Sequence, residues 1–139
     1  MLDVKKTFTK ICEALSGMLN SVSTTNMAST TSVSSGTNTT LCNTGSLSPG
    51  TYILNATAIF PEASGGYRRI FFATSNSGNA MSRFARVNAA PASGADTDVK
   101  LTTLVTISSA ATYYLRAYQN SGSSLSVETA GIQVLKIHA

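Results

Sequence analysis

The sequence has few of the residues on which enzymes most often rely. Its 139 residues include one histidine, six acidic residues and no tryptophan. The histidine, His138, stands next to the C-terminal residue, which is a poor place to preorganise the base of a Ser-His-Asp arrangement. Lysozyme-like acid pairs, phosphate-binding loops and Cys-His sites are also missing. We therefore expect a protein that is not an enzyme.

Cysteines and long apolar runs are scarce as well. Cys12 and Cys42 lie in different regions, with no second pair to complete a zinc site, so two free thiols are expected. The lysines near the N-terminus are not followed by the continuous apolar core of a signal peptide. No apolar run approaches the length of a membrane span. These features predict a protein that is made in a cytoplasm and is not inserted into a membrane.

Charge is the third scarce property, since only 12% of the residues are charged. The abundance of Ser, Thr, Asn, Gly and Ala suits a β-rich protein with a neutral hydroxyl surface, and the chain is too apolar to be disordered. The net charge of +4 is spread along the sequence, and the arginines are scattered among apparent strands. Nucleic-acid binding favours a basic stripe interleaved with aromatics, so no nucleic-acid partner is predicted.

The acidic residues include one close pair, Asp96 and Asp98, in the segment SGADTDVK. Two carboxylates two positions apart in a loop could hold a calcium ion together with backbone carbonyls. They could equally be solvated turn residues, and this second interpretation is favoured. Calcium is therefore a weak candidate, and no other cofactor is predicted.

Residues 2–22 have the pattern of a helix with a narrow apolar stripe. Apolar residues recur at alternating steps of four and three, which is the a/d pattern of a coiled coil: Val4, Phe8, Ile11, Leu15, Met18 and Val22. Asp3 near the start favours the helix dipole. The stripe could serve self-association, docking onto another protein or packing on its own domain. We expect residues 1–22 to act as a trimerising or anchoring helix.

A segment rich in Ser and Thr follows the helix. Residues 20–49 contain sixteen Ser or Thr, no charged residue and no helical period. Such a composition is typical of an extended linker, so residues 23–36 are predicted to be a tether. From about Thr37 the β-branched threonines indicate the first strand of a head domain, which is assigned to residues 37–139.

The remaining residues form short apolar runs separated by turn signals. Strands are expected at 51–60, 67–74, 81–89, 98–107, 112–119, 123–128 and 131–138. Regular short strands without βαβ alternation indicate an all-β sandwich or barrel. In residues 51–60 one face is apolar throughout and the other is only half apolar. The sequence leaves open whether that second face meets water or another copy of the chain.

Four segments in this region share their order and spacing with a known superfamily. They are LSPGTYILNATAIF, GGYRRIFFAT, YYLRAYQNSGSSLSV and GIQVLKI. Residues 37–139 resemble the jelly-roll domain of the tumour-necrosis-factor and complement-head superfamily, in the form found in bacteriophage structural proteins. The resemblance implies an antiparallel jelly-roll sandwich of two sheets, assembled as a threefold homotrimer with the half-apolar faces near its axis. Neighbouring aromatics such as Phe71 and Phe72 fit this arrangement, because one of each pair must point away from its own core.

The function that the resemblance implies is that of a virion appendage. The helix would attach a trimeric fibre to other virion proteins, and the head would contact a glycan on the host surface, after synthesis in the host cytoplasm. One alternative is a purely architectural capsid or tail decoration. A bacterial trimeric surface or lectin module, or a secreted signalling module, is disfavoured by the missing signal peptide, and a glycan-cleaving enzyme is disfavoured by the missing acid pair. Loops tolerate variation better than a sandwich core does, so receptor contacts are expected in the turns that carry Ser64, Asn76, Asn79 and Asp96.

Overall fold

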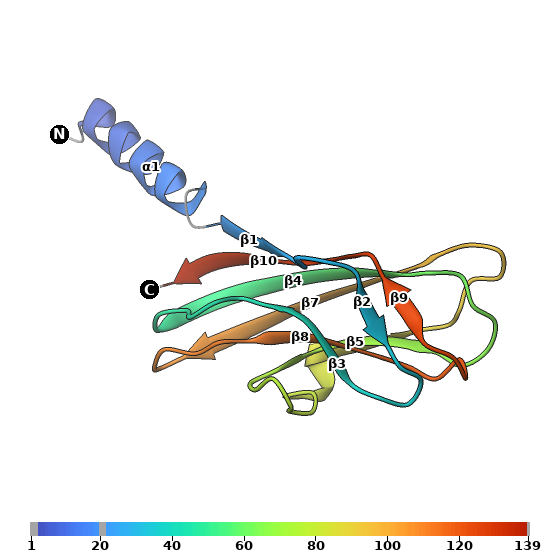
Figure 1. Cartoon of the computed structure of the whole chain (residues 1–139). Coiled ribbons are helices and arrows are strands. Elements are labelled where there is room, and N and C mark those ends of the chain that lie inside the picture. Colours follow the sequence, from blue (N-terminus) through green and yellow to red (C-terminus); the bar gives the residue numbers. More distant parts are fainter. Residues whose placement is uncertain (1–2, 20–21, 139) are drawn as a thin grey trace.

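The structure, a computed structural model, describes residues 3–19 and 22–138, without the side chains of residues 16–19 and 138. In these residues a single helix precedes an antiparallel β-sandwich (Figure 1). The elements in chain order are α1 (Val4–Leu19), β1 (Val22–Asn26), β2 (Thr31–Val33), β3 (Thr39–Asn43), β4 (Gly50–Phe60), β5 (Arg68–Ala73), the 3-10 turn η1 (Arg83–Ala85), β6 (Arg86–Ala89), β7 (Thr97–Ile107), β8 (Tyr114–Gln119), β9 (Leu125–Val127) and β10 (Thr129–His138).

The strands form two four-stranded sheets and one short pair. The first sheet has the order β1-β10-β4-β7, and the second sheet has the order β3-β8-β5-β6. The pair β2-β9 lies between them, because β9 is next to β4 of the first sheet and β2 is next to β3 and β8 of the second. Neighbouring strands run antiparallel throughout. The predicted all-β jelly-roll sandwich is confirmed.

The core lies between the two sheets and follows the alternation of the sequence. In β4 the residues from Tyr52 to Phe60 at even positions are buried, and in β7 the odd-numbered residues from Thr97 to Ile107 are buried. The second sheet faces them with Ile70, Phe72 and Leu115, which are fully buried. Removal of these apolar side chains from water is the main force that holds the sheets together.

Most strand boundaries match the predicted ones, but residues 81–89 do not form a single strand. The amide of Ala85 donates to the carbonyl of Ser82 over 3.2 Å and closes the 3-10 turn η1, so β6 begins only at Arg86. The turn buries Ala85 and leaves the ring of Phe84 exposed. In a strand, Phe84 and Ala85 would also point to opposite faces of the sheet. The sequence pattern therefore does not distinguish a 3-10 turn from a strand at these residues.

The prediction of a free tether at 23–36 is wrong. Residues 22–26 form β1 and pair with β10, while residues 31–33 form β2 and pair with β9. Val33 is fully buried, and the amide of Gly36 donates to the carbonyl of Gln119 over 2.8 Å. The uncharged threonines of this segment suit edge strands, because β-branched side chains favour extended backbone. The sandwich therefore begins at residue 22 instead of residue 37.

Helix α1 projects from the sandwich and does not cover its core (Figure 1). Asp3 caps its start, since the amide of Lys6 donates to Asp3 Oδ1 over 3.1 Å. All side chains from residue 4 to residue 15 are exposed, including those of the apolar stripe. Of the three interpretations of the stripe, packing on its own domain is thus excluded by the structure.

Candidate functional site

The outer face of the first sheet carries a row of apolar side chains. The register places Val22 opposite Leu135, Leu135 opposite Ile53, and Ile53 opposite Leu104. These four side chains, called here the apolar row, point away from the core because their neighbours Tyr52 and Leu54 point into it. Leu104 is 62% exposed and Val22 is 49% exposed, and Ile53 and Leu135 between them are half-buried. Exposed apolar side chains that are contiguous across a sheet are typical of an interaction surface.

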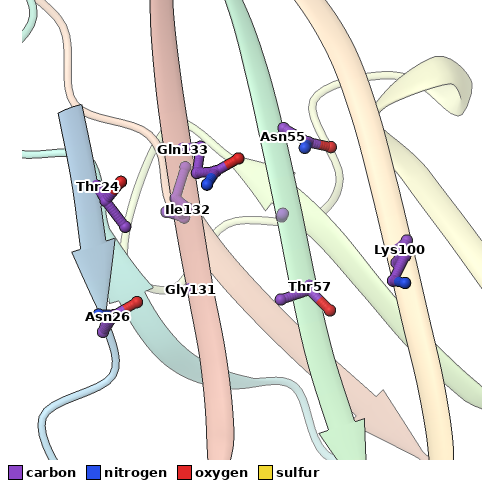
Figure 2. A pocket seen from close by; sticks show the side chains of 9 residues that line it. Thr24, Asn26, Asn55, Thr57, Lys100, Gly131, Ile132 and Gln133 are labelled. Atoms are coloured by element: carbon purple, nitrogen blue, oxygen red, sulfur yellow. The ribbon is translucent and has the colours of Figure 1, made fainter. Parts of the chain in front are cut away.

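A polar groove of about 270 Å³ lies beside the apolar row on the same face (Figure 2). Its polar side chains come from all four strands of the sheet: Thr24 and Asn26, Gln133, Asn55 and Thr57, and Lys100. Gly131 forms part of the floor of the groove. A Cβ at this position would lie only 2.7 Å from Asn26 Oδ1, so a larger residue would force the Asn26 side chain to move. Thr102 Oγ1 donates to Asn55 Oδ1 over 2.8 Å, which orients this amide.

The chemistry of the groove is that of neutral hydrogen bonding with one ion pair. Lys100 Nζ lies 3.1 Å from Asp98 Oδ2, and Thr57 Oγ1 donates to Asp98 Oδ1 over 3.1 Å. Both charged side chains are well exposed, so water screens the pair and its contribution to stability is small. The groove can therefore bind hydroxyl or amide groups through these side chains.

The structure places the two residues of the predicted calcium pair in different elements. Asp98 lies in β7 and is engaged by Lys100 and Thr57, whereas Asp96 is exposed in the preceding loop and lines another hollow together with Glu128. Among the described residues no three His, Cys, Asp or Glu side chains lie close enough to hold a metal ion. The calcium prediction therefore lacks a third side-chain ligand.

The four predicted receptor-contact residues do not come together. The loops 61–67 and 90–96 lie at the end of the sandwich away from α1 (Figure 1), because the end of β4 pairs with the start of β7. Ser64 and Asp96 lie in these distal loops. Asn76 and Asn79 follow β5, which runs back towards the opposite end. The Asn76 carbonyl accepts from Thr40 Oγ1 over 3.1 Å, and Asn79 lines a hollow on the second sheet.

A buried arginine holds the first distal loop. Arg68 is fully buried, and its guanidinium donates to the carbonyls of Ala63 over 2.8 Å and Gly65 over 3.2 Å. Desolvation lowers the pKa of Arg68 from its ordinary value, because burial disfavours the charged form. Its Nε is buried without a hydrogen-bond partner among the described residues. The sequence shows that residue 68 is basic, but not that its side chain is buried. That follows from its position in β5, where it shares the inward face with Ile70 and Phe72.

A buried glutamine holds the neighbouring segments at the same end. Gln119 is fully buried, and its amide nitrogen donates to the carbonyls of Val33 over 2.8 Å and Ser123 over 2.6 Å. Its carbonyl oxygen accepts from the amide of Ser121 over 2.7 Å. Asn120 completes the link, because its Oδ1 accepts from the amide of Tyr67 over 2.7 Å. These bonds fix the backbone of the distal end and leave the loop side chains on its surface.

The outer face of the second sheet gathers the arginines, which sequence reasoning described as scattered. Arg69 lies in β5, Arg116 in β8 and Arg86 in β6, and Arg83 lies in the adjoining turn η1. Phe71 on this face is 2% exposed because Arg116 lies over its ring, with 5.8 Å from Cζ to the centroid. Phe71 is thus covered by its own chain. The Gly-Tyr-Arg-Arg order was visible in the sequence, but the grouping of the arginines requires the strand order.

The apolar stripe of α1 is open over its described part. Val4 and Phe8 are 72% and 66% exposed, and Ile11 and Leu15 are just over half exposed. Met18 belongs to α1, but its side chain lies outside the described residues, as does that of His138. In the part of the chain that the structure describes, no helix has the length and apolarity needed to cross a bilayer.

The sequence matches no protein-family model and no curated protein at a significant level. Its fold, in contrast, is shared with solved structures. The chain superposes with a TM-score of 0.57 and 14% identity on a structure of infectious bursal disease virus, strain Gt, covering 83% of this chain and 33% of the viral chain. A VP2 subviral particle of the same virus gives a TM-score of 0.55 and 13% identity, with 83% and 32% covered.

A second group of similar structures has a different origin. The Eiger TNF protein of S. frugiperda superposes with a TM-score of 0.54 and 8% identity, and 84% of this chain and 92% of that protein are covered. The present chain spans about a third of the viral chains and nearly all of the TNF protein. At these identities the similarity is one of fold, and it agrees with the predicted resemblance to a TNF-like jelly roll.

Proposed function

We propose that the chain is a structural protein of a virion, in which a jelly-roll head is attached through its N-terminal helix. The observation that carries this proposal is the open apolar stripe of α1, whose side chains find no partner in the head among the described residues. A narrow a/d stripe of this kind is built to bind other helices or an apolar surface. The fold shared with VP2 of a viral particle supports the same role. No catalytic step is needed for it.

The head is proposed to assemble as a homotrimer through the outer face of the first sheet. The apolar row is the part of this face whose burial stabilises the assembly most, because Leu104 and Val22 are about half exposed or more. Each large aliphatic side chain that becomes fully buried contributes about 1.5–3 kcal/mol. The polar groove beside the row supplies amides and hydroxyls that can form hydrogen bonds across an interface. The half-apolar face of β4 would then meet another copy of the chain.

The distal end of the head is proposed to contact the host surface. The loops 61–67 and 90–96 lie far from α1 and present small polar side chains. Arg68 holds the backbone of the first of them through the carbonyl of Ala63. Such loops can form hydrogen bonds with sugar hydroxyls at little ordering cost. Three copies on one axis would raise a weak affinity through avidity. If the tip binds no host surface, we propose instead that the protein is an architectural decoration of the particle. In either case we propose that the chain is made in the host cytoplasm before assembly.

The assembly can be tested on the full chain by light scattering coupled to size exclusion. We expect three times the single-chain mass of 14.4 kDa. A monomer at concentrations of tens of micromolar would contradict the trimer. Attachment is tested by adding purified protein to particles that lack it and measuring incorporation. An intact trimer that neither incorporates nor binds whole host cells would contradict the virion role.

A further inference from the structure

The second sheet has a one-sided charge distribution. All five arginines of the chain lie in this sheet or in the turn η1 that leads into β6. The six acidic residues lie outside these elements: Asp3, Glu13, Glu62, Asp96, Asp98 and Glu128. In the described part of the chain no arginine forms a salt bridge, since the ion pair seen there joins Lys100 and Asp98. The outer face of this sheet thus carries positive charge that is not neutralised locally.

Two of the arginines are already occupied by the backbone. Arg68 points inward to the carbonyls of the first distal loop. Arg116 donates from Nη2 to the Asn38 carbonyl over 2.9 Å, from Nε to Thr40 Oγ1 over 3.1 Å, and from Nη1 to the Gly78 carbonyl. These bonds hold the segments 38–40 and 78 against the sheet. The side chains that remain available on the outer face are those of Arg69, Arg83 and Arg86.

Arg69 and Arg86 line one hollow of about 170 Å³, called here the arginine hollow. Its other walls are Asn38, Asn79, Ala80 and the edge of Phe71. The two arginines are diagonal neighbours in the sheet, because Arg69 pairs with Asn88 and Arg86 pairs with Phe71. Arg86 is exposed, and its guanidinium forms no hydrogen bond with the described residues. The hollow therefore combines two guanidinium groups with two side-chain amides.

Arg69 is held in place before any ligand arrives. Its Nε donates to Asn88 Oδ1 over 2.8 Å, and its Nη2 donates to Tyr67 Oη over 3.1 Å. Its Cζ lies 5.1 Å and 5.3 Å from the ring centroids of Tyr67 and Tyr118, which stack on each other at 5.5 Å. Cation–π contacts and hydrogen bonds orient the guanidinium and reduce the entropy lost on binding.

We propose that the arginine hollow binds an acidic polysaccharide through the carboxylate of one sugar unit. A planar carboxylate matches the fork of an arginine, and such bonds are about twice as strong as neutral ones. Asn38 and Asn79, which line the hollow, are placed to bind sugar hydroxyls. This inference rests on the proposed host contact for its biological role, but it places that contact on the sheet as well as on the distal loops.

Two other occupants fit the observations less well. Nucleic acid needs several phosphate contacts in a line and free aromatic faces for stacking. Here two arginines are held by carbonyls, and Tyr67 and Tyr118 stack on each other. A second copy of the chain that used the same face would bring arginines against arginines. The hollow also lies on the opposite side of the sandwich from the apolar row, so it stays open in the proposed trimer.

The test uses the full chain and polygalacturonate fragments, with affinity measured by calorimetry. We expect Arg86→Gln to weaken binding about tenfold, and Arg69→Gln with Arg86→Gln to abolish it, since hydrogen bonds to charged groups are among the strongest in proteins. Lys5→Gln with Lys10→Gln is the matched control, because it removes the same charge from α1; it should change the affinity less than twofold. Arg86 is exposed, so its variant keeps the fold, which the melting temperature verifies.

Ligand controls separate the possible outcomes. Methyl-esterified polygalacturonate has the same backbone without the charge, and equal binding to it would overturn the proposal. Equal binding to dextran sulfate would show a general anion site, and tighter binding to a single-stranded oligonucleotide would show a nucleic-acid site; either would also overturn it. The variant Leu104→Lys, which is expected to be monomeric, should bind fragments short enough to occupy a single hollow with unchanged affinity per site, because such fragments gain nothing from avidity. Failure of the trimer and failure of the arginine hollow are therefore distinguishable.

Discussion

Ile53 and Leu104 are register partners in β4 and β7, and both side chains lie on the outer face of the first sheet. Leu135 and Val22 continue this contact line across β10 and β1. Cross-strand apolar pairs stabilise a sheet by a few tenths of a kcal/mol to about 1 kcal/mol even when they face water. A row across all four strands contributes more stabilisation when a second surface covers it, because its side chains then leave water. This gain is the basis of the proposed trimer.

Replacement of Leu104 by Lys is expected to convert the proposed trimer into monomers. The new charge would have to be buried without a partner in the interface, whereas in the monomer it lies in water because Leu104 is already 62% exposed. Light scattering gives the mass, and thermal unfolding of the monomer shows that the fold is retained. Phe84→Lys is the control, since it makes a similar change at an exposed site in η1. A trimer that survives Leu104→Lys but not Phe84→Lys would place the interface on the second sheet.

Two substitutions in α1, Ile11→Asp and Leu15→Asp, are expected to abolish incorporation into particles and to leave the head stable. The described side chains from 4 to 15 are exposed, so no packing in the head is lost. The melting temperature of the sandwich should change by less than about 2 °C, as is usual for surface substitutions. Lys6→Asp with Lys10→Asp is the control outside the stripe. A large loss of head stability in the stripe variant would refute the independence of helix and head.

The alternation of apolar residues predicted the long strands because each has one face in the core. Every second residue is buried from Tyr52 to Phe60 in β4 and over all eleven positions of β7, a pattern typical of a strand with one face in the core. The short strands β1 and β2 were missed for the opposite reason. Three to five residues with a single buried Val33 are too few to show a period, and their threonines resemble a linker.

The candidate sites were less predictable than the fold, because they depend on which strands become neighbours. Arg68 and Arg69 are adjacent in sequence, yet one holds a loop from inside the core and the other faces the arginine hollow. Their roles follow from strand parity, which a shift of one residue would exchange. Asn79 was predicted as a loop contact, and its place beside Arg86 depends on how residues 74–82 fold back onto the sheet.

Removal of the buried guanidinium at Arg68 is expected to destabilise the distal end. Arg68→Met keeps the apolar stem but removes the hydrogen bonds to the carbonyls of Ala63 and Gly65, and a hydrogen bond to a charged group contributes about 1.5–3 kcal/mol. We expect a loss of about 2–4 kcal/mol in urea unfolding, together with faster amide exchange in residues 62–67. Arg83→Met, on an exposed arginine, should change the stability by less than about 0.5 kcal/mol. Equal effects at the two sites would contradict the role assigned to Arg68.

Cys42 is expected to make the stability of the head fall at alkaline pH. This half-buried thiol lies in β3, and its burial raises its pKa from the ordinary value of 9.0 to about 11. The folded state therefore keeps a proton that the unfolded state loses. The resulting stabilisation is complete below pH 9 and is lost as the pH rises from 9 to 11, because stability falls with pH wherever the native state binds more protons.

Urea unfolding at pH 8, 9, 10 and 11 measures this contribution when the parent is compared with Cys42→Ala. The difference between the two proteins should be constant up to about pH 9 and should shrink above it, while Cys12→Ala, in the exposed position on α1, should follow the parent at every pH. Burial of Tyr113 raises its pKa too, but this tyrosine is present in all three proteins and its effect cancels in the differences.

The raised pKa of Cys42 also implies slow alkylation of its thiol, because only about one thiol in a thousand is ionised at pH 8 when the pKa is near 11. A difference that stays constant to pH 11, or rapid labelling of Cys42 at pH 8, would show that the thiol is solvated and that β3 is not held against the core as described.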